Sequence, residues 1–104
     1  MPAYMIVAAK LHDRDAFIAG YGKAAAELVP RFGGRYVFRG RGATLLEGPW
    51  GAEASVLISE WPDMAAVHRF WASPEYAEVK KLREGLADVQ VLALEGQFSL
   101  PPDA

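Results

Sequence analysis

The sequence predicts an α+β domain of the ferredoxin-like type, in which an antiparallel sheet carries two helical segments on one face. Three observations predict this fold. Apolar runs typical of strands occur near residues 3–10, 54–61 and 89–98, and an alternating run begins at residue 34. Helical periodicity fills the gap after the first strand and the gap before the last one. The resulting order is β-α-β-β-α-β, which fits a single domain in a chain of 104 residues.

The first strand is expected at Ala3–Lys10, where almost every residue is apolar. Asp13 or Asp15 can then cap a helix that runs to about Phe32. One face of this helix is apolar through Phe17, Tyr21, Ala24 or Ala25, and Leu28. The Gly33-Gly34 pair is a typical helix stop, so the chain is expected to leave the helix there.

The second strand begins with strict alternation, which places Tyr36 and Phe38 on one face and Arg35, Arg39 and Arg41 on the other. Gly40 and Gly42 suggest a bulge or turn within a bent strand that continues to Glu47. A loop at 48–51 leads to the third strand, which is expected at Ala54–Trp61.

The segment Trp61–Leu86 is expected to form two short helices that are broken at Ser73-Pro74. Ser73 is a plausible N-cap, and Pro62 and Pro74 suit first-turn positions. Apolar side chains share one face of each helix: Met64, Val67, Phe70 and Trp71 on the first, and Tyr76, Val79, Leu82 and Leu86 on the second. The fourth strand is expected at Val89–Phe98, which gives one domain over 1–98 and a C-terminal tail over 99–104.

The strands are apolar on both faces, although the helices can cover only one. A second copy of the same sheet would cover the other face, and two-fold dimers are the commonest oligomers. The sequence therefore predicts a homodimer formed through the sheet face. The alternatives are that this face holds a ligand or is left partly exposed.

Composition excludes several classes of function. The net charge of −2 provides no general attraction to nucleic acid or to anionic membranes. The chain has no cysteine, which excludes disulfides and thiol chemistry, and it has no apolar run of membrane-spanning length. Its histidines and carboxylates show no metal-ligand spacing, so neither a metal site nor a cofactor is predicted. A cytoplasmic protein without nucleic-acid or membrane partners is expected.

Several segments together resemble a known family. They are the opening MPAYMIV, then FGGRYVFRG, LEGPW, ISEWPD and FWASPEYAEVKKLR, and they span most of residues 1–98. The chain resembles a bacterial family catalogued as a domain of unknown function within the dimeric α/β-barrel superfamily. That resemblance implies a dimeric α/β barrel. The superfamily includes cofactor-free monooxygenases, muconolactone-type isomerases, haem-degrading enzymes and stress-induced proteins, whereas the family has no established reaction.

The candidate site centres on Arg83 and Tyr76, which lie seven residues apart and so project to the same side of a helix. Arg83 would hold an anion, and Tyr76 or His68 would move a proton. Trp71, Phe70 and Trp61 would form an aromatic wall that excludes water, and Arg39 could contribute to the pocket. The alternatives are a structural ion pair of Arg83 with Glu75 or Glu60, and an ordinary surface histidine at position 68.

Two hypotheses for the function follow from these residues. In the first, an apolar pocket between the sheet and the helices binds or transforms a small aromatic or acidic metabolite, by substrate-assisted oxygenation or proton-transfer isomerisation. In the second, the protein is a non-catalytic dimeric binding or stress-related module. A cavity of a few hundred Å³ beside Arg83 would favour the first hypothesis.

Overall fold

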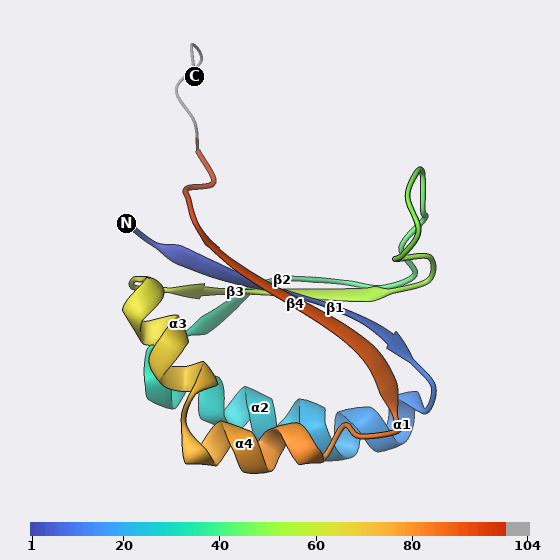
Figure 1. Cartoon of the computed structure of the whole chain (residues 1–104), viewed down its shortest axis with the longest axis horizontal. Coiled ribbons are helices and arrows are strands. Elements are labelled where there is room, and N and C mark those ends of the chain that lie inside the picture. The colour runs from blue at the N-terminus through green and yellow to red at the C-terminus, as the bar shows by residue number, and fades with distance from the viewer. Residues whose placement is uncertain (100–104) are drawn as a thin grey trace.

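The computed structural model describes residues 1–99, and these form a four-stranded antiparallel sheet with helices on one face (Figure 1). The strands are β1 (Ala3–Leu11), β2 (Arg35–Gly40), β3 (Ser55–Trp61) and β4 (Ala87–Glu95), in the spatial order β2-β3-β1-β4. The predicted ferredoxin-like arrangement is confirmed. Most of the predicted tail, 99–104, lies outside the described residues.

The first helical segment runs from Arg14 to Phe32 and changes its helical type along the way. It consists of α1 (Arg14–Phe17), a π-helical turn (Ile18–Gly22), α2 (Lys23–Leu28) and a 3₁₀ turn (Val29–Phe32). The predicted cap is Asp13, whose Oδ1 accepts a hydrogen bond from the Ala16 amide at 3.1 Å. The two glycines that weaken helix propensity, Gly20 and Gly22, both fall in the π-helical turn.

The predicted helix stop at Gly33-Gly34 is confirmed, and each glycine is needed for a different reason. Gly33 has a φ of 93°, in the left-handed region that glycine tolerates best. A Cβ on Gly34 would lie 2.8 Å from both the Trp61 ring and a Val29 methyl group. The absence of a side chain at position 34 therefore allows the end of this helical segment to pack directly on β3.

The second strand is shorter than predicted and does not alternate strictly. Its register against β3 shifts between Tyr36, which pairs with Ser59, and Phe38, which pairs with Ile58. This bulge places Tyr36 on the helix-covered face and Phe38 on the open face. It also separates Arg35 and Arg39, which pair with Glu60 and Leu57 and so lie on opposite faces. The prediction of one shared face for each set was wrong, because one extra residue reverses the alternation.

The predicted continuation of this strand to Glu47 was also wrong, because β2 ends at Gly40 and a long loop fills 41–54. Two backbone hydrogen bonds between Ala43 and the residues Glu53 and Ala54 close the base of this loop. Gly42, Gly48 and Gly51 adopt positive φ within it. Such glycines allow turns rather than a pleated strand.

Of the two helices after β3, the second begins where the sequence predicted and the first begins two residues later than predicted. They are α3 (Met64–Trp71) and α4 (Pro74–Lys81). Ser73 is the cap of α4, with Pro74 at its first position, as predicted. Pro62 is not in the first turn of α3, because Asp63 is the cap. Helix α4 ends at Lys81, so the predicted helical positions of Leu82, Arg83 and Leu86 were wrong.

The core lies between the helices and one face of the sheet. Trp61 and Phe70 are its largest fully buried side chains, and their ring centroids lie 5.0 Å apart. Buried residues from both layers surround them: Ala3, Met5, Tyr21, Ala25, Leu28, Val29, Ala66, Val67 and Tyr76. Most of the predicted apolar stripes contribute to this core, but Trp71 and Leu82 were wrongly included, because they are 38% and 46% exposed, and Leu86 does not belong to it either.

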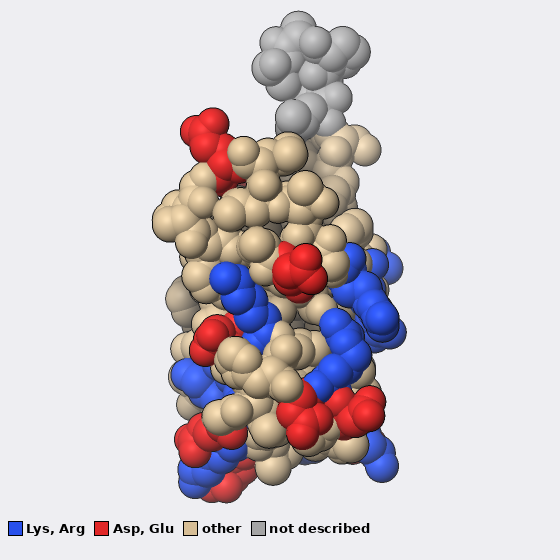
Figure 2. Space-filling model, turned by 90° about the vertical axis from the view of Figure 1, so that its right-hand side faces the viewer, with Lys and Arg blue, Asp and Glu red and all other residues tan. Residues whose placement is uncertain are grey.

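The opposite face of the sheet carries no helix in the part of the chain that the structure describes (Figure 1). Large apolar side chains are exposed on it, among them Phe38, Leu92 and Leu94 at 51%, 54% and 49%. The loop 41–54 and residues 96–99 after β4 both project from the sheet on this side. Figure 2 shows charged side chains gathered over the helical half of the molecule, with fewer toward the projecting loop. A monomer would leave this apolar face in water.

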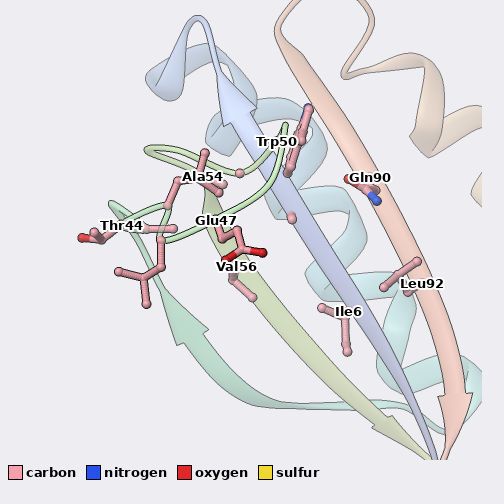
Figure 3. A pocket seen from close by; sticks show the side chains of 13 residues that line it. Ile6, Thr44, Glu47, Trp50, Ala54, Val56, Gln90 and Leu92 are labelled. Atoms are coloured by element: carbon pink, nitrogen blue, oxygen red, sulfur yellow. The ribbon is translucent and has the colours of Figure 1, made fainter.

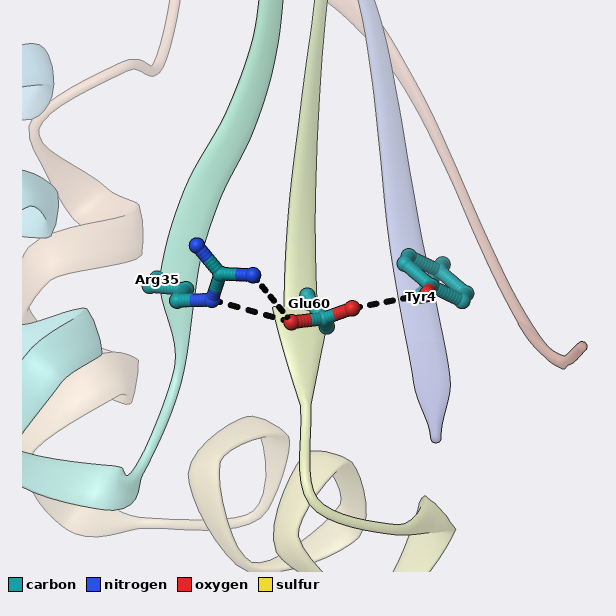
Figure 4. Close-up of polar contacts among 3 residues, drawn as sticks. All are labelled: Tyr4, Arg35 and Glu60. Atoms are coloured by element: carbon teal, nitrogen blue, oxygen red, sulfur yellow. Dashed lines mark hydrogen bonds and ion pairs between the residues drawn. The ribbon is translucent and has the colours of Figure 1, made fainter. Parts of the chain in front are cut away.

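One polar network crosses the open face near the sheet edge (Figure 4). The Tyr4 hydroxyl donates to Glu60 at 2.7 Å, and Arg35 forms a hydrogen bond and an ion pair with the same carboxylate at 2.9 and 2.7 Å. The hydrogen bond from Tyr4, followed by that from Arg35, lowers the pKa of Glu60 below its usual value. Glu60 therefore stays ionised at neutral pH, and its carboxylate links β3 to Tyr4 on β1 and to Arg35 on β2.

Candidate functional site

A cavity of about 320 Å³ lies between the first helical segment and the covered face of the sheet. Its floor is formed by β1, β2 and β3, and its roof by residues from α1 to the 3₁₀ turn. Apolar side chains make up most of the lining: Met5, Val7, Ala9, Leu11, Phe17, Ile18, Ala25, Ala26, Val29, Leu57 and Phe70. A mostly apolar cavity with a few polar groups is the usual form of a small-molecule site.

The polar groups divide the cavity into two ends along β3. Ser59, with Tyr36 beside it in the register, marks the aromatic end that Phe70 closes. Ser55 marks the opposite end, which Arg14 reaches from α1. Arg41 lines the cavity just past Gly40, the partner of Val56, whereas Arg39 pairs with Leu57, midway between the two serines. Because Ser55 and Ser59 are four residues apart on a strand, these ends are separated by ~13 Å. A ligand here would meet aromatic groups at one end and guanidinium groups at the other.

The basic end has no acidic counterpart among the described residues. The Arg14 Nη2 donates to the Ser55 Oγ at 3.0 Å, and within residues 1–99 neither Asp nor Glu lines the cavity. The ion pairs in this same range involve Arg35, Lys81 and His12, and none of the three cavity arginines. The site therefore holds three positive charges in a chain whose net charge is −2.

Tyrosines connect the cavity to the core behind it. The Tyr21 and Tyr76 hydroxyls lie 2.9 Å apart in a buried hydrogen bond. Burial, with a smaller effect of Tyr21, raises the pKa of Tyr36 to about 12, although the nearby Arg39 acts in the opposite direction. Burial and then Tyr21 raise the pKa of Tyr76 as well. Tyr36 and Tyr76 therefore remain protonated at neutral pH and can donate hydrogen bonds.

Among the residues predicted from the sequence, Phe70 and Arg39 line this cavity, Phe70 at its aromatic end and Arg39 beside Leu57 in the middle of its floor. Trp61 stands behind the lining, with its Nε1 donating to the Ser59 Oγ at 2.9 Å. Tyr76 also lies behind it, with its ring 4.6 Å from Phe70. The structure thus brings Phe70, Trp61 and Tyr76 together as one aromatic cluster.

The other predicted residues lie elsewhere. Arg83 follows α4 and places its guanidinium 5.2 Å from the Tyr21 ring centroid. Its Nη1 is buried, and within residues 1–99 it has no hydrogen-bond partner. Of the two carboxylates considered as its partner, Glu60 instead bonds to Tyr4 and Arg35. The role of Arg83 as an anion anchor stays a prediction.

Trp71 and His68 lie on the surface of α3. Trp71 is 38% exposed, and the Lys80 Nζ lies 4.7 Å from its ring centroid. His68 is exposed. Neither residue lines the cavity. The role of His68 in proton transfer therefore stays a prediction, with no support from this cavity. Tyr21 connects Arg83 and Tyr76 to the cavity. It lines the cavity, its hydroxyl is hydrogen-bonded to that of Tyr76, and the Arg83 guanidinium lies over its ring.

Sequence reasoning missed Arg14, Tyr21 and Arg41 as site residues, although it placed Tyr21 in the core stripe and Arg41 on a strand face with Arg35 and Arg39. A signal for Arg14 exists in the sequence. It follows the capping residue Asp13 directly. A positive charge in the first turn of a helix interacts unfavourably with the positive end of the helix dipole. A cation at such a position suggests another role, which here includes the hydrogen bond to Ser55.

Two further hollows lie outside this cavity. One, of about 500 Å³, is open to solvent on the open face of the sheet, where loop 41–54 arches over Ile6, Val56 and Leu92 (Figure 3). Trp50 from this loop lies over it, with the Lys10 Nζ 5.1 Å from its ring centroid. The other, of about 390 Å³, lies between α4 and β4 and includes Lys80, Lys81 and Arg83.

Within residues 1–99, no three His, Cys, Asp or Glu side chains come together as a metal-binding group. In the same part of the chain, no helix is both long and apolar enough to cross a bilayer.

Comparisons with known proteins agree with this architecture. A family model described as a domain of unknown function, DUF1330, matches residues 2–97. None of the curated proteins compared with the chain matches it. The chain is similar to the crystal structure of RPA0582, a protein of unknown function from Rhodopseudomonas palustris. The TM-score is 0.76 at 25% identity, and the match covers 94% of this chain and 84% of that one.

Two more distant structures share the fold. SnoaB, a cofactor-independent oxygenase from Streptomyces nogalater, matches with a TM-score of 0.68 at 20% identity, covering 96% of this chain and 97% of that one. A dimeric ferredoxin-like protein of unknown function from Jannaschia matches with a TM-score of 0.64 at 15% identity, covering 92% and 100%. At these identities the likeness shows the fold alone.

Proposed function

Because this chain belongs to the DUF1330 family, whose description assigns no activity, we propose a function from its cavity: the protein binds a small, partly apolar metabolite between its first helical segment and its sheet. The observation that carries this proposal is the cavity of about 320 Å³ with an aromatic end and a basic end. A volume near 300 Å³ is at the lower end of ligand pockets.

The cavity-lining residues suit binding better than general base catalysis. A general base must accept a proton near neutral pH and lie within hydrogen-bond reach of it. The titratable side chains that line the cavity are arginines and tyrosines, and the pKa of Tyr36 is raised to about 12. Proton-transfer isomerisation therefore has little support from the lining.

Substrate-assisted oxygenation is the reaction type that this lining leaves open. In such a reaction an enolate or phenolate within the substrate supplies the electrons that dioxygen accepts, one oxygen atom enters the substrate and the other leaves as water. The role of the protein is to bind and position that anion. SnoaB, which is described as a cofactor-independent oxygenase, shares the fold of this chain. The non-catalytic alternative differs only in that the bound metabolite leaves unchanged.

We also propose that the chain acts as a homodimer formed through the open face of the sheet. The exposed Phe38, Leu92 and Leu94 support this assembly, as does the description of the Jannaschia protein of the same fold as dimeric. A second sheet would cover these side chains and the hollow under loop 41–54. The first helical segment lies on the other side of the sheet, so the cavity would stay accessible in such a dimer.

Filling the cavity tests the binding proposal. Ala25 is 5% exposed and lines the cavity, so Ala25→Leu is expected to occupy part of it, at a cost in stability of about 1–3 kcal/mol where the larger side chain crowds the core. Thermal-shift and tryptophan-fluorescence titrations with phenylacetate, benzoate and hexanoate should show binding to the parent and at least tenfold weaker binding to this variant. Ala19→Leu is the matched control, because Ala19 is exposed on the same helical segment and does not line the cavity. Equal binding by all three proteins would contradict the proposed site.

A further inference from the structure

We infer that the cavity selects a small organic anion, such as a single-ring or short-chain carboxylate, that is already ionised before it binds. The inference rests on the proposed function and specifies the class of its ligand. It draws on three features of the lining: its charge, its division into two ends and its volume.

The charge of the cavity lining differs from that of the whole chain. A protein of net charge −2 repels anions at long range, so an anion gains affinity only from a local group of cations. Arg14, Arg39 and Arg41 all line the cavity, Arg39 and Arg41 as exposed residues at its rim, and no Asp or Glu of the described residues lines it to neutralise them. Their guanidinium groups present planar sets of N–H donors that match carboxylate oxygens.

The positions of these arginines in the fold support a shared target. They come from segments that are distant in sequence, since Arg14 begins α1 whereas Arg39 and Arg41 lie at the end of β2 and just beyond it. The bulge in β2 turns Arg39 toward the helix-covered face, where it pairs with Leu57 on β3. Without this extra residue, Arg39 would lie on the open face with Arg35. The irregularity of β2 therefore adds Arg39 to the lining of the cavity.

The division of the cavity fixes the orientation of the ligand. An acidic group at the arginines leaves the rest of the molecule to extend along β3 toward Tyr36 and Phe70. Apolar atoms placed there are removed from water against Met5, Val29 and Phe70, which stabilises an apolar body. The Tyr36 hydroxyl and the Ser59 hydroxyl can meet one polar substituent on that body.

The volume limits the size of the ligand. Ligand pockets usually range from about 300 to 1,000 Å³, and the larger ones hold drug-sized molecules. A cavity of about 320 Å³ suits one aromatic ring with an acidic side chain, or a short aliphatic acid. A flat system of three fused rings would require the helix to move away from the sheet.

The ligand must arrive ionised because the cavity lining, as far as the structure describes it, offers no group to deprotonate it. The arginines are permanently protonated, and the tyrosines act as hydrogen-bond donors. Carboxylic acids have pKa values near 4 and are ionised at neutral pH without assistance. Neutral phenols or alcohols would gain little from the basic end.

The test compares acids with their neutral amides. Isothermal titration of the full chain with phenylacetate and phenylacetamide, and with hexanoate and hexanamide, should give at least tenfold tighter binding of each acid. The double variant Arg39→Gln/Arg41→Gln should reduce this ratio to near one. The control Arg31→Gln/Arg69→Gln removes the same charge from exposed arginines that do not line the cavity, and it should keep the ratio. Added salt should weaken the binding of the acids and leave the binding of the amides unchanged.

The outcomes separate the two levels of the proposal. Equal binding of acids and amides, with no effect of the cavity arginines, would overturn the anion inference and leave the binding cavity in place. Tighter binding of anthracene-9-carboxylate than of phenylacetate would overturn the size limit. Failure of every acid and amide to bind the parent would overturn the proposed function, and the inference with it.

Discussion

Leu92→Glu is expected to convert the protein from a dimer into a monomer. Leu92 lies on the open face of the sheet, where it is 54% exposed and lines the hollow beneath loop 41–54. In the proposed dimer, a second sheet buries it, and burial of a leucine side chain stabilises by about 1.5–3 kcal/mol. A glutamate there would be buried without a partner, which is strongly unfavourable. Two-fold symmetry places this change in the interface twice.

Light scattering after size-exclusion chromatography measures this outcome directly. The parent should have twice the chain mass of 11.3 kDa, and the variant should have the mass of one chain. Leu82→Glu is a matched control, because Leu82 is a similarly exposed leucine at the end of α4, on the side of the helices. A monomeric parent, or a dimer that persists in Leu92→Glu and dissociates in Leu82→Glu, would contradict the proposed interface.

Phe70→Ala is expected to cause one of the largest losses of folding stability that a single change in the core can produce. The Phe70 side chain is 2% exposed and its ring contacts Phe32, Trp61 and Tyr76 at centroid distances of 5.7, 5.0 and 4.6 Å. Truncation of a buried phenylalanine removes these contacts and leaves a void, at a cost of about 3–5 kcal/mol. It also removes the aromatic end of the ligand cavity.

Urea unfolding at one protein concentration measures this loss, because the stability of a dimer depends on concentration. Trp71→Ala is the control. Its side chain is 38% exposed and packs on Tyr76 at the surface, so the loss of unfolding free energy should be well under half as large. Equal losses in the two variants would mean that Phe70 is not the centre of the core.

The sequence predicted the order and type of the elements because their apolar periodicities are strong. The cap at Asp13, the break at Ser73-Pro74 and the stop at Gly33-Gly34 were all visible as local signals. The bulge in β2 was not, because the register shifts at Val37, an ordinary strand residue, whereas the glycines that are typical of bulges lie farther along, at 40 and 42. One inserted residue there reversed the faces of Phe38 and Arg39.

The candidate site was only partly predictable for a related reason. Phe70 and Trp61 were found because a buried aromatic stripe on a helix is visible in sequence. The basic end depends on Arg14 and Arg39 coming together from α1 and β2, and no local pattern encodes that distance. Arg83 was placed on a helix face by its spacing from Tyr76, but α4 ends before it, and the residue reaches Tyr21 from a turn instead.

Mapping the bound ligand by NMR tests the central claim most directly, because it reports where a small acid binds. A titration of the isotopically labelled protein with phenylacetate should shift the backbone amide signals of Arg39–Arg41, Ser55–Ser59 and Tyr21–Ala26, which surround the cavity. The signals of His68 and Trp71 on the surface of α3 should stay in place. Shifts confined to the open face of the sheet, or to the groove at Lys80 and Arg83, would show that the ligand site lies elsewhere.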